Sequence, residues 1–333
     1  MKLLWLDLNS SYAHSSLALP ALHAQIADDT TIEWCIVSAT INENTGMVVS
    51  RIHKHRPDII AATNWLFNHE QLLHIISRAK ALLPHCCIVL GGPEFLGNNE
   101  AFLYKNKFVS GVFRGEGEEV FPQWLKVWNH SKETWKSITG LCYLDENGRY
   151  QDNGIARVMN FSQLVSPEKS CFFNWSKPFV QLETTRGCFN TCAFCVSGGE
   201  KPVRTIPLEA IRERLNDIHQ HGIKNVRVLD RTFNYNNKRA KELLDLFRQY
   251  PDICFHLEIH PALLSEELKQ ELSVLPKGLL HLEAGIQSLK ESVLQQSRRI
   301  GKLSDALEGL KYLCSLKNME THADLIAGLP LYH

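Results

Sequence analysis

Two series of short apolar segments, each alternating with amphipathic segments, place the strongest constraint on how this 333-residue chain can fold. In the first series the apolar runs have strand-like length, and the segments between them carry apolar residues at helical spacing. The predicted strands span residues 3–8, 31–37, 59–63, 87–90 and 109–113, and the predicted helices span 16–26, 45–55, 69–83 and 118–128. This alternation predicts a doubly wound parallel sheet, with ligands at the carboxyl ends of its strands.

The second series begins at Phe179 and predicts another parallel sheet built from five β/α units. Its predicted strands span 179–184, 225–229, 253–259, 279–284 and 321–326, and its predicted helices span 208–221, 238–250, 266–275, 289–296 and 303–316. Between the two series, Asp145-Glu-Asn-Gly148 is a hairpin signal, and an irregular segment follows it. We therefore predict an α/β chain with domains at 1–135 and 179–333, joined by a hairpin and linker at 136–178.

The charge and composition of the chain exclude several classes of function. The 36 Lys and Arg residues balance the 36 Asp and Glu residues, so nothing draws the whole chain toward nucleic acid or an anionic membrane. No apolar run approaches the 18 residues of a membrane span, and the first apolar stretch is too short for a signal peptide. We expect a cytoplasmic protein without a membrane partner, whose ten cysteines do not form a disulfide framework.

Three of the ten cysteines lie on one short loop, Cys188-Phe-Asn-Thr-Cys192-Ala-Phe-Cys195, directly after the first strand of the second series. Thiolates suit iron–sulfur clusters, zinc or Cu(I). Three of them can hold three corners of a cubane cluster and leave the fourth iron open. A closed zinc site needs a fourth Cys or His, and the nearest downstream histidines lie far along the next helix. The pattern favours a [4Fe–4S] cluster over structural zinc or coincidence, and we interpret the other seven cysteines mostly as core residues.

The Cys-x3-Cys-x2-Cys spacing, with the aromatic Phe194 before the last cysteine, resembles the signature of the radical S-adenosylmethionine (SAM) enzymes. The resemblance extends over Phe179–Pro330 and implies a partial (β/α) barrel, with SAM across the carboxyl ends of its strands. It further implies that the reduced cluster cleaves SAM to methionine and a 5′-deoxyadenosyl radical, which abstracts a hydrogen from an unreactive carbon. The implied partners are an electron donor such as flavodoxin or ferredoxin, and an unknown substrate.

The same resemblance assigns candidate SAM contacts to the strand tips. The tips carry Asp230, Glu258-Ile-His-Pro261, Gly285-Ile-Gln-Ser288 and Asp324-Leu-Ile-Ala-Gly-Leu-Pro330. Arg299 is a further candidate, because its guanidinium could pair with the SAM carboxylate, although it could also be a solvated arginine. Gly198-Gly-Glu200 looks like the family's Gly-Gly-Glu motif but follows the last cysteine too closely, so we assign it to the cluster loop. The predicted SAM-binding residues are Phe194, Asp230, Glu258, Gln287, Ser288, Arg299 and Ile326.

The first series resembles the Rossmann-type cobalamin-binding domain that precedes the radical SAM domain in many enzymes. Three loops on the carboxyl side of the sheet would contact the corrin, and two adjacent glycines would allow close backbone approach. The predicted contacts are Asn9, Ser10, Ser11, Tyr12, His14, Gly91, Gly92, Glu94, Gly115 and Glu116. The family's cobalt-ligating Asp-x-His-x-x-Gly loop is absent, since Ser-Ser-Leu follows His14. Either cobalamin binds without a protein ligand to cobalt, or the domain keeps the fold without the cofactor and His14 is an ordinary loop histidine.

Bound cobalamin would make methylation of an unactivated carbon the leading reaction. A rearrangement or other radical chemistry without cobalamin remains an alternative, whereas methylthiolation is disfavoured because Cys35, Cys86 and Cys87 lack the extra three-cysteine spacing. Relatives continue into a sixth strand, so we expect this chain to be truncated after its fifth, and a non-catalytic fragment that only binds the cluster is a further alternative. A zinc-held nucleic-acid module is disfavoured by the neutral charge.

Overall fold

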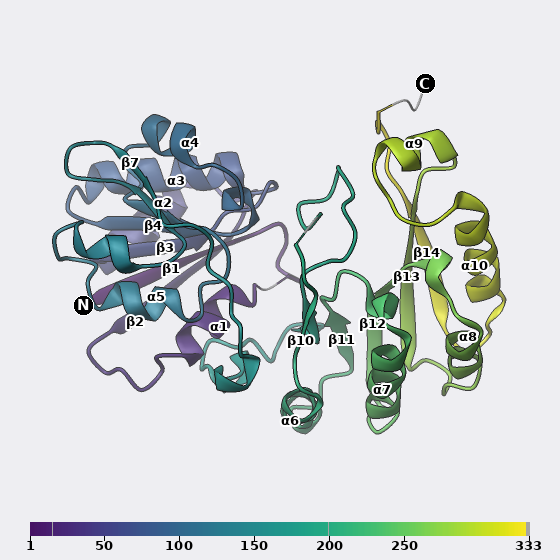
Figure 1. Cartoon of the computed structure of the whole chain (residues 1–333). Helices are drawn as coiled ribbons and strands as arrows, with labels where there is room; N and C mark the ends of the chain where they lie inside the picture. The colour runs from purple at the N-terminus through teal and green to yellow at the C-terminus, as the bar shows by residue number, and fades with distance from the viewer. Residues whose placement is uncertain (15, 199, 331–333) are drawn as a thin grey trace. The chain divides into compact units, whose positions relative to one another are not determined.

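The computed structural model describes residues 1–14, 16–198 and 200–330 (Figure 1). The chain divides into two compact units, Met1–Lys177 and Pro178–His333. Both units are α/β with parallel sheets, which confirms the predicted fold class. Among the residues that the structure describes, no helix is long and apolar enough to cross a membrane. Residues 331–333, on which the expected truncation depends, and Gly199 of the Gly-Gly-Glu sequence lie outside the described residues.

The first unit is built on a seven-stranded sheet with the order β2-β1-β3-β4-β5-β6-β7. Its strands are β1 (Lys2–Asn9), β2 (Glu33–Thr40), β3 (Ile59–Thr63), β4 (Cys87–Gly91), β5 (Gly111–Phe113), β6 (Leu141–Leu144) and β7 (Tyr150–Asp152). Its helices are α1 (Ala18–Ala24), α2 (Thr45–His55), α3 (His69–Leu82), α4 (Glu100–Lys105) and α5 (Val120–Leu125), with 3-10 turns η1 (Pro93–Phe95), η2 (Thr134–Ser137), η3 (Phe161–Gln163) and η4 (Pro167–Lys169). The first five strands are parallel, and the hairpin β6–β7 adds to the sheet antiparallel to β5. The hairpin predicted between the two domains is thus part of the first sheet.

The central strands of the first unit are buried on both faces, which explains why they appear as unbroken apolar runs in the sequence. Leu4 and Leu6 of β1 belong to a core with residues of α2 and α3. Leu3 and Trp5 point the other way, into a core that contains Trp124 of α5. In Figure 1 the strands accordingly lie between α2 and α3 on one side and α5 on the other. Because apolar side chains cover both faces of this sheet, the ends of its strands are the places where a ligand can bind.

The second unit has a five-stranded parallel sheet with the order β14-β13-β12-β11-β8. Each strand along the chain joins the edge left by the previous one, as in a partial barrel. Its strands are β8 (Val180–Leu182), β11 (Asn225–Val228), β12 (Cys254–Ile259), β13 (Leu280–Gln287) and β14 (Glu320–Leu325), and a short separate ribbon pairs β9 (Thr185–Arg186) with β10 (Arg204–Thr205). Its helices are α6 (Leu208–Gln220), α7 (Asn237–Phe247), α8 (Glu266–Ser273), α9 (Glu291–Gln296) and α10 (Leu303–Ser315), with 3-10 turns η5 (Phe233–Tyr235) and η6 (Pro261–Leu263).

The sheet of the second unit has one apolar face and one polar face. On β12, Phe255 is buried, and Phe247 of α7 stacks on it with ring centroids 4.0 Å apart and planes at 10°. The alternate residues of the strands are half-buried or exposed and point away from this core. We call this side the polar face, and its residues are Arg227, His256, Glu258, His281, Glu283, His322 and Asp324. A parallel sheet with one polar face can receive a ligand along its strands as well as at their ends.

Candidate functional site

The three clustered cysteines lie on a loop, residues 187–203, whose base is closed by backbone hydrogen bonds. The β9–β10 ribbon pairs the two ends of the loop, and the N–H of Cys188 donates to the carbonyl of Glu200 over 2.9 Å. Gly187 has a φ of 94°, and a Cβ there would overlap the same Glu200 carbonyl. The backbone polar groups of an irregular loop need hydrogen-bond partners, and this ribbon supplies them at the two ends of the loop.

Within the loop the chain folds back tightly enough to gather the thiols. The N–H of Cys195 donates to the carbonyl of Cys192 over 3.2 Å, and a Cβ on Gly198 would lie 2.5 Å from that carbonyl. Cys188 and Cys192 are buried and Cys195 is exposed. Burial raises the pKa of the Cys188 and Cys192 thiols, and repulsion from the neighbouring thiolates raises each pKa further.

Three soft donors in mutual electrostatic contact fit a metal that binds thiolates, because coordination replaces the protons and relieves the repulsion. The donor set therefore suits the predicted cluster. The other seven cysteines are less uniform than expected, since Cys171 and Cys314 are exposed rather than in the core.

The cysteine loop is fastened to the connection between α9 and α10. The N–H of Ala193 donates to Ser297 O over 2.9 Å, and the N–H of Ile300 donates to Asn190 Oδ1 over 3.2 Å. Arg299 lies between the loop and the sheet: its Nη1 is 4.0 Å from Cys192 Sγ, and its Nη2 donates to Gly285 O over 2.5 Å. Arg299 is half-buried, so the solvated alternative is wrong, and a cation stands directly beside the thiols.

Asp230, predicted to contact SAM, is buried and hydrogen-bonded within the protein. Its carboxylate accepts hydrogen bonds from the N–H of Thr184 (2.8 Å), the N–H of Thr185 (3.0 Å) and the Thr184 hydroxyl, and the residue is 2% exposed. Burial raises the pKa of this carboxyl, while the hydrogen bonds act in the opposite direction. With its oxygens occupied, Asp230 is a positioning residue that fixes the chain between β8 and the cysteine loop, rather than a free SAM contact.

Several of the other predicted SAM residues converge around Gly285. Gln287 has a left-handed φ of 68°, its side chain folds back over Gly285, and its carbonyl accepts from the N–H of Ile326 over 2.9 Å. A non-glycine residue in this region is uncommon and often marks a functional site. Ser288 is fully buried, and its hydroxyl accepts from the N–H of Lys290, so it supports the start of α9 instead of facing a ligand. Phe194 is half-buried in the cysteine loop itself.

Glu258 lies on the polar face with an altered acidity. Burial and the repulsion of Glu283 raise its pKa to about 7, against the attraction of Arg231 and Arg227. A carboxyl with this pKa is divided between its two protonation states near neutral pH. It can therefore exchange a proton with a bound ligand.

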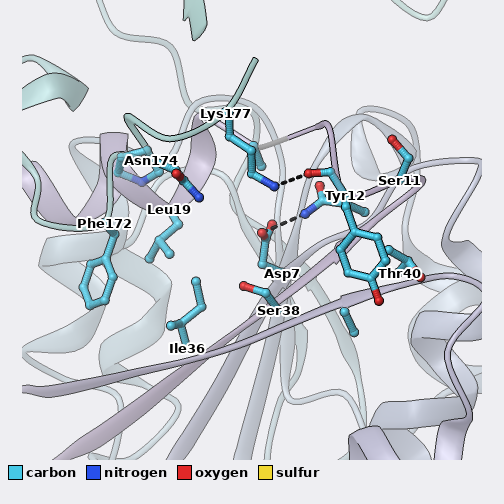
Figure 2. A pocket seen from close by; sticks show the side chains of 14 residues that line it. Asp7, Ser11, Tyr12, Leu19, Ile36, Ser38, Thr40, Phe172, Asn174 and Lys177 are labelled. Carbon is cyan, nitrogen blue, oxygen red and sulfur yellow. Dashed lines mark hydrogen bonds between the residues drawn. The ribbon is translucent and has the colours of Figure 1, made fainter. Parts of the chain in front are cut away.

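In the first unit, Asn9, Ser11 and Tyr12 help to line a pocket of about 150 Å³ at the carboxyl ends of β1 and β2 (Figure 2). Asn9 Nδ2 donates to Asp7 Oδ2 over 2.7 Å, and the Lys177 ammonium donates to the Tyr12 carbonyl. Polar groups and the apolar Leu19, Ile36 and Phe172 line it together, so it can accept a small group that has both kinds of surface.

The other two predicted corrin contacts after β1, Ser10 and His14, lie in the same loop. His14 Nδ1 is 2.8 Å from the Ser11 hydroxyl, so this imidazole is held within its own loop, and Ser10 lies half-buried just before it. The arrangement agrees with the alternative that His14 is an ordinary loop histidine.

The glycines after β4 and β5 serve contacts inside the chain. Gly92 has a φ of 110°, and a Cβ there would lie 2.5 Å from the carbonyl of Asn64 at the end of β3, while the neighbouring Glu94 is exposed. Gly91 accepts from the N–H of Asn64 over 2.7 Å. These contacts hold the ends of β3 and β4 together.

Gly115 and Glu116 make backbone and side-chain contacts with the segment that follows the hairpin. Gly115 bridges to Ala156, and a Cβ on Gly115 would overlap the Ala156 carbonyl. Glu116 Oε2 accepts from the N–H of Val158 over 2.7 Å. These contacts give both residues a structural role, and their assignment as corrin contacts stays a prediction.

Sequence analysis missed an apolar loop at the same edge of the sheet. Trp65, Leu66 and Phe67 follow Asn64, the first residue after β3, and are 36%, 83% and 47% exposed. Asn68 anchors this loop, because its Nδ2 donates to Leu8 O and Thr63 O and its Oδ1 accepts from the N–H of Trp65. The sequence signal for this loop is a run of three apolar residues between two asparagines. An exposed apolar group of this kind is typical of a binding surface.

Replacement of Asp230 by Asn tests its positioning role. The amide cannot accept all three hydrogen bonds, so buried donors of Thr184 or Thr185 lose a partner, and we expect a loss of about 1–3 kcal/mol in the free energy of unfolding. The iron content after reconstitution is expected to fall, while the SAM dissociation constant of the molecules that retain iron stays within about twofold. A large loss of SAM affinity at unchanged stability would contradict this role and restore the direct contact.

Replacement of Glu258 by Gln tests the shifted pKa. The carboxyl has a higher pKa in the folded chain than its ordinary 4.5, so the folded state holds the proton more tightly, and the stability contributed by Glu258 falls as pH rises from 4.5 through about 7. The variant lacks this loss and is expected to be more stable than the parent by on the order of 2 kcal/mol at pH 8, and equal to it near pH 4.5. Urea unfolding of both proteins in EDTA across this pH range measures the difference. Parallel stability curves would contradict the assignment.

Comparisons with known proteins agree with both units. Residues 8–125 match the B12 binding domain, and residues 182–331 match the radical SAM superfamily. A protein named as an uncharacterised methyltransferase of Pyrococcus horikoshii is 26% identical over 84% of this chain, and the hopanoid C-3 methylase of Methylococcus capsulatus is 24% identical over 78%. The chain covers 62% and 51% of the length of these relatives, respectively.

A solved structure has the same fold. The radical SAM methyltransferase TsrM from Kitasatospora setae, with cobalamin and a [4Fe–4S] cluster bound, aligns with a TM-score of 0.76 at 16% identity, over 98% of this chain and 69% of that one. The two family matches together span most of the present chain, in the order in which the two folded units occur. The chain therefore belongs to the radical SAM proteins that carry an N-terminal B12-binding domain.

Proposed function

We propose that this protein is a cobalamin-dependent radical SAM enzyme that methylates an unactivated carbon. The observation that carries the proposal is the closed loop that gathers Cys188, Cys192 and Cys195 beside Arg299, in a chain that also has a B12-binding domain. The names of the relatives support methyl transfer, since one is a methylase, and the similar solved structure contains both cofactors.

In this proposal the three thiolates bind three irons of a [4Fe–4S] cluster and leave the fourth iron for SAM. The bound cluster supplies the electron that breaks a carbon–sulfur bond of SAM, giving methionine and a 5′-deoxyadenosyl radical. Arg299 provides a fixed cation at this place for the SAM carboxylate. Gln287 and Ile326 join the ends of β13 and β14, which gives the cofactor a continuous backbone surface to rest on.

The first unit contributes the cobalamin site. The loops after β1 and β3 place Tyr12 and the exposed apolar group Trp65, Leu66 and Phe67 at the carboxyl edge of the sheet. Apolar and aromatic side chains suit the face of a large macrocycle and keep water away from it. No cobalt ligand is assigned to His14, because Ser-Ser-Leu follows it and the Asp-x-His-x-x-Gly loop is absent.

We also propose a flavodoxin or ferredoxin as the electron donor and a cytoplasmic location. The ten free cysteines, three of them gathered for a metal, suit a reducing compartment. The substrate is a molecule with an unactivated carbon that accepts a methyl group.

Product analysis tests the proposal. The chain is reconstituted anaerobically with iron and sulfide, loaded with hydroxocobalamin, and incubated with reductant and SAM bearing a deuterated methyl group. Reductive cleavage yields 5′-deoxyadenosine, and methyl transfer from SAM to cobalamin leaves S-adenosylhomocysteine, so mass spectrometry is expected to detect both. Cys192→Ala should lose at least ~90% of the 5′-deoxyadenosine, whereas the exposed Cys314→Ala on α10 should retain it.

The two products separate the alternatives. Formation of 5′-deoxyadenosine without cobalamin-dependent S-adenosylhomocysteine would overturn the methyltransferase assignment and favour radical chemistry without cobalamin. Absence of both products from a protein with a full complement of iron would overturn catalysis by this chain.

A further inference from the structure

The polar face of the second unit holds a second group of metal-binding side chains, away from the cysteine loop in sequence. His256 lies on β12, His281 and Glu283 lie on β13, and His322 lies on β14. The sheet register pairs His256 with His281 and Glu283 with His322 across neighbouring strands. Three adjacent parallel strands therefore bring imidazoles and a carboxylate to one place, on a rigid support.

The distances within this group are those of a nearly formed metal site. His256 Nε2 is 3.0 Å from Glu283 Oε2, and His322 Nε2 is 3.5 Å from the same oxygen. The ligand atoms of the three residues all lie within 4.8 Å of one another. Bonds of about 2.0–2.2 Å to a tetrahedral zinc ion require ligand atoms roughly 3.3 Å apart. Small side-chain movements would therefore complete the coordination.

The surrounding contacts orient the ligand nitrogens. His281 Nε2 is 2.9 Å from His322 Nδ1, and this hydrogen bond leaves the other nitrogen of His322 directed at Glu283. Metal-bound histidines commonly have such a partner on the second ring nitrogen. His256 Nε2 is buried and, within the described part of the chain, meets no partner in hydrogen-bonding geometry, although Glu283 is near. A cation between these groups would use a lone pair that the protein leaves without a hydrogen bond.

The carboxyl groups around the site favour a cation, and several contacts compete with it. Glu258 and Asp324 lie on the same face as Glu283, but Asp324 hydrogen-bonds to Glu283, and Arg231 and Arg227 attract Glu258. Arg227 Nη2 lies 3.3 Å from His256 Nδ1, and this nitrogen must keep its proton if Nε2 is to bind a metal. Arg227 is exposed, so its side chain can turn away into solvent.

We propose that His256, Glu283 and His322 bind a divalent first-row transition cation of the zinc type, with His281 as the positioning residue for His322. Two imidazoles and one carboxylate are the ligands of open zinc sites, in which the fourth position takes water or an anionic group. The nitrogen and oxygen ligands differ from the thiolates of the cysteine loop, so removal of the loop thiolates separates the two sites experimentally. The proposal does not depend on methyl transfer or on cobalamin.

Zinc titration of two forms of the full chain tests the proposal. One form is the reconstituted protein, in which the cluster occupies the three loop cysteines. The other, the triple-serine form, carries Cys188→Ser, Cys192→Ser and Cys195→Ser, which removes the thiols of the loop. Anaerobic calorimetry is expected to detect one equivalent of Zn²⁺ in both. Co²⁺ in the triple-serine form is expected to give d–d absorption bands without a thiolate-to-cobalt charge-transfer band. No stoichiometric metal in the triple-serine form would overturn the site.

Further substitutions in the triple-serine form assign the ligands. His256→Ala and Glu283→Gln are each expected to weaken zinc binding at least ~10-fold, whereas His221→Ala, an exposed histidine just after α6, is expected to leave it unchanged. His281→Leu should also weaken binding, and His281→Gln, which retains a hydrogen-bond acceptor, should largely restore it. Arg227→Gln should bind zinc more tightly, because the competing contact is removed. Equal zinc affinity in the parent, His256→Ala and Glu283→Gln forms, with circular dichroism showing all of them folded, would overturn the proposal.

Discussion

The hydrogen bonds that Asp230 accepts from Thr184 and Thr185 form the junction on which the rest of the candidate site depends. A buried carboxylate is costly unless hydrogen bonds satisfy it, and the backbone N–H groups of a chain leaving a sheet have the same need. Here the Asp230 carboxylate accepts hydrogen bonds from the Thr184 and Thr185 N–H groups, so both needs are met. The junction fixes the direction in which the chain enters the cysteine loop, and the β9–β10 ribbon and Asn190 hold the loop further along.

The two sheets of the chain leave different places for chemistry. In the first unit both faces are packed with apolar side chains, so polar groups and exposed aromatic residues gather at the strand ends. In the second unit one face carries histidines and carboxylates along β12, β13 and β14. The second unit therefore has polar groups both in the cysteine loop at one end of its strands and along one face of its sheet.

The parts of the structure that could be predicted from the sequence are the local ones. The cysteine spacing and the strand–helix alternation are visible within short windows, and the structure places the three cysteines on one loop closed by the β9–β10 ribbon. The role of Asp230 was not visible, because it depends on β11 lying beside β8, 46 residues apart in the sequence. The structural role of Gly115 was hidden for the same reason, since its partner Ala156 belongs to the segment after the hairpin. The histidine group on the polar face arises only from the register of three strands.

The central claim is that Cys188, Cys192 and Cys195 hold a cubane cluster with one iron open to SAM. The most direct measurement is electron paramagnetic resonance of the reconstituted, dithionite-reduced protein, recorded with and without SAM. The account predicts a reduced [4Fe–4S] signal that changes on addition of SAM, is lost in Cys195→Ala and persists in Cys171→Ala, which removes an exposed cysteine outside the loop. A signal indifferent to SAM, or stoichiometric zinc on the three thiolates in place of a cluster, would contradict it.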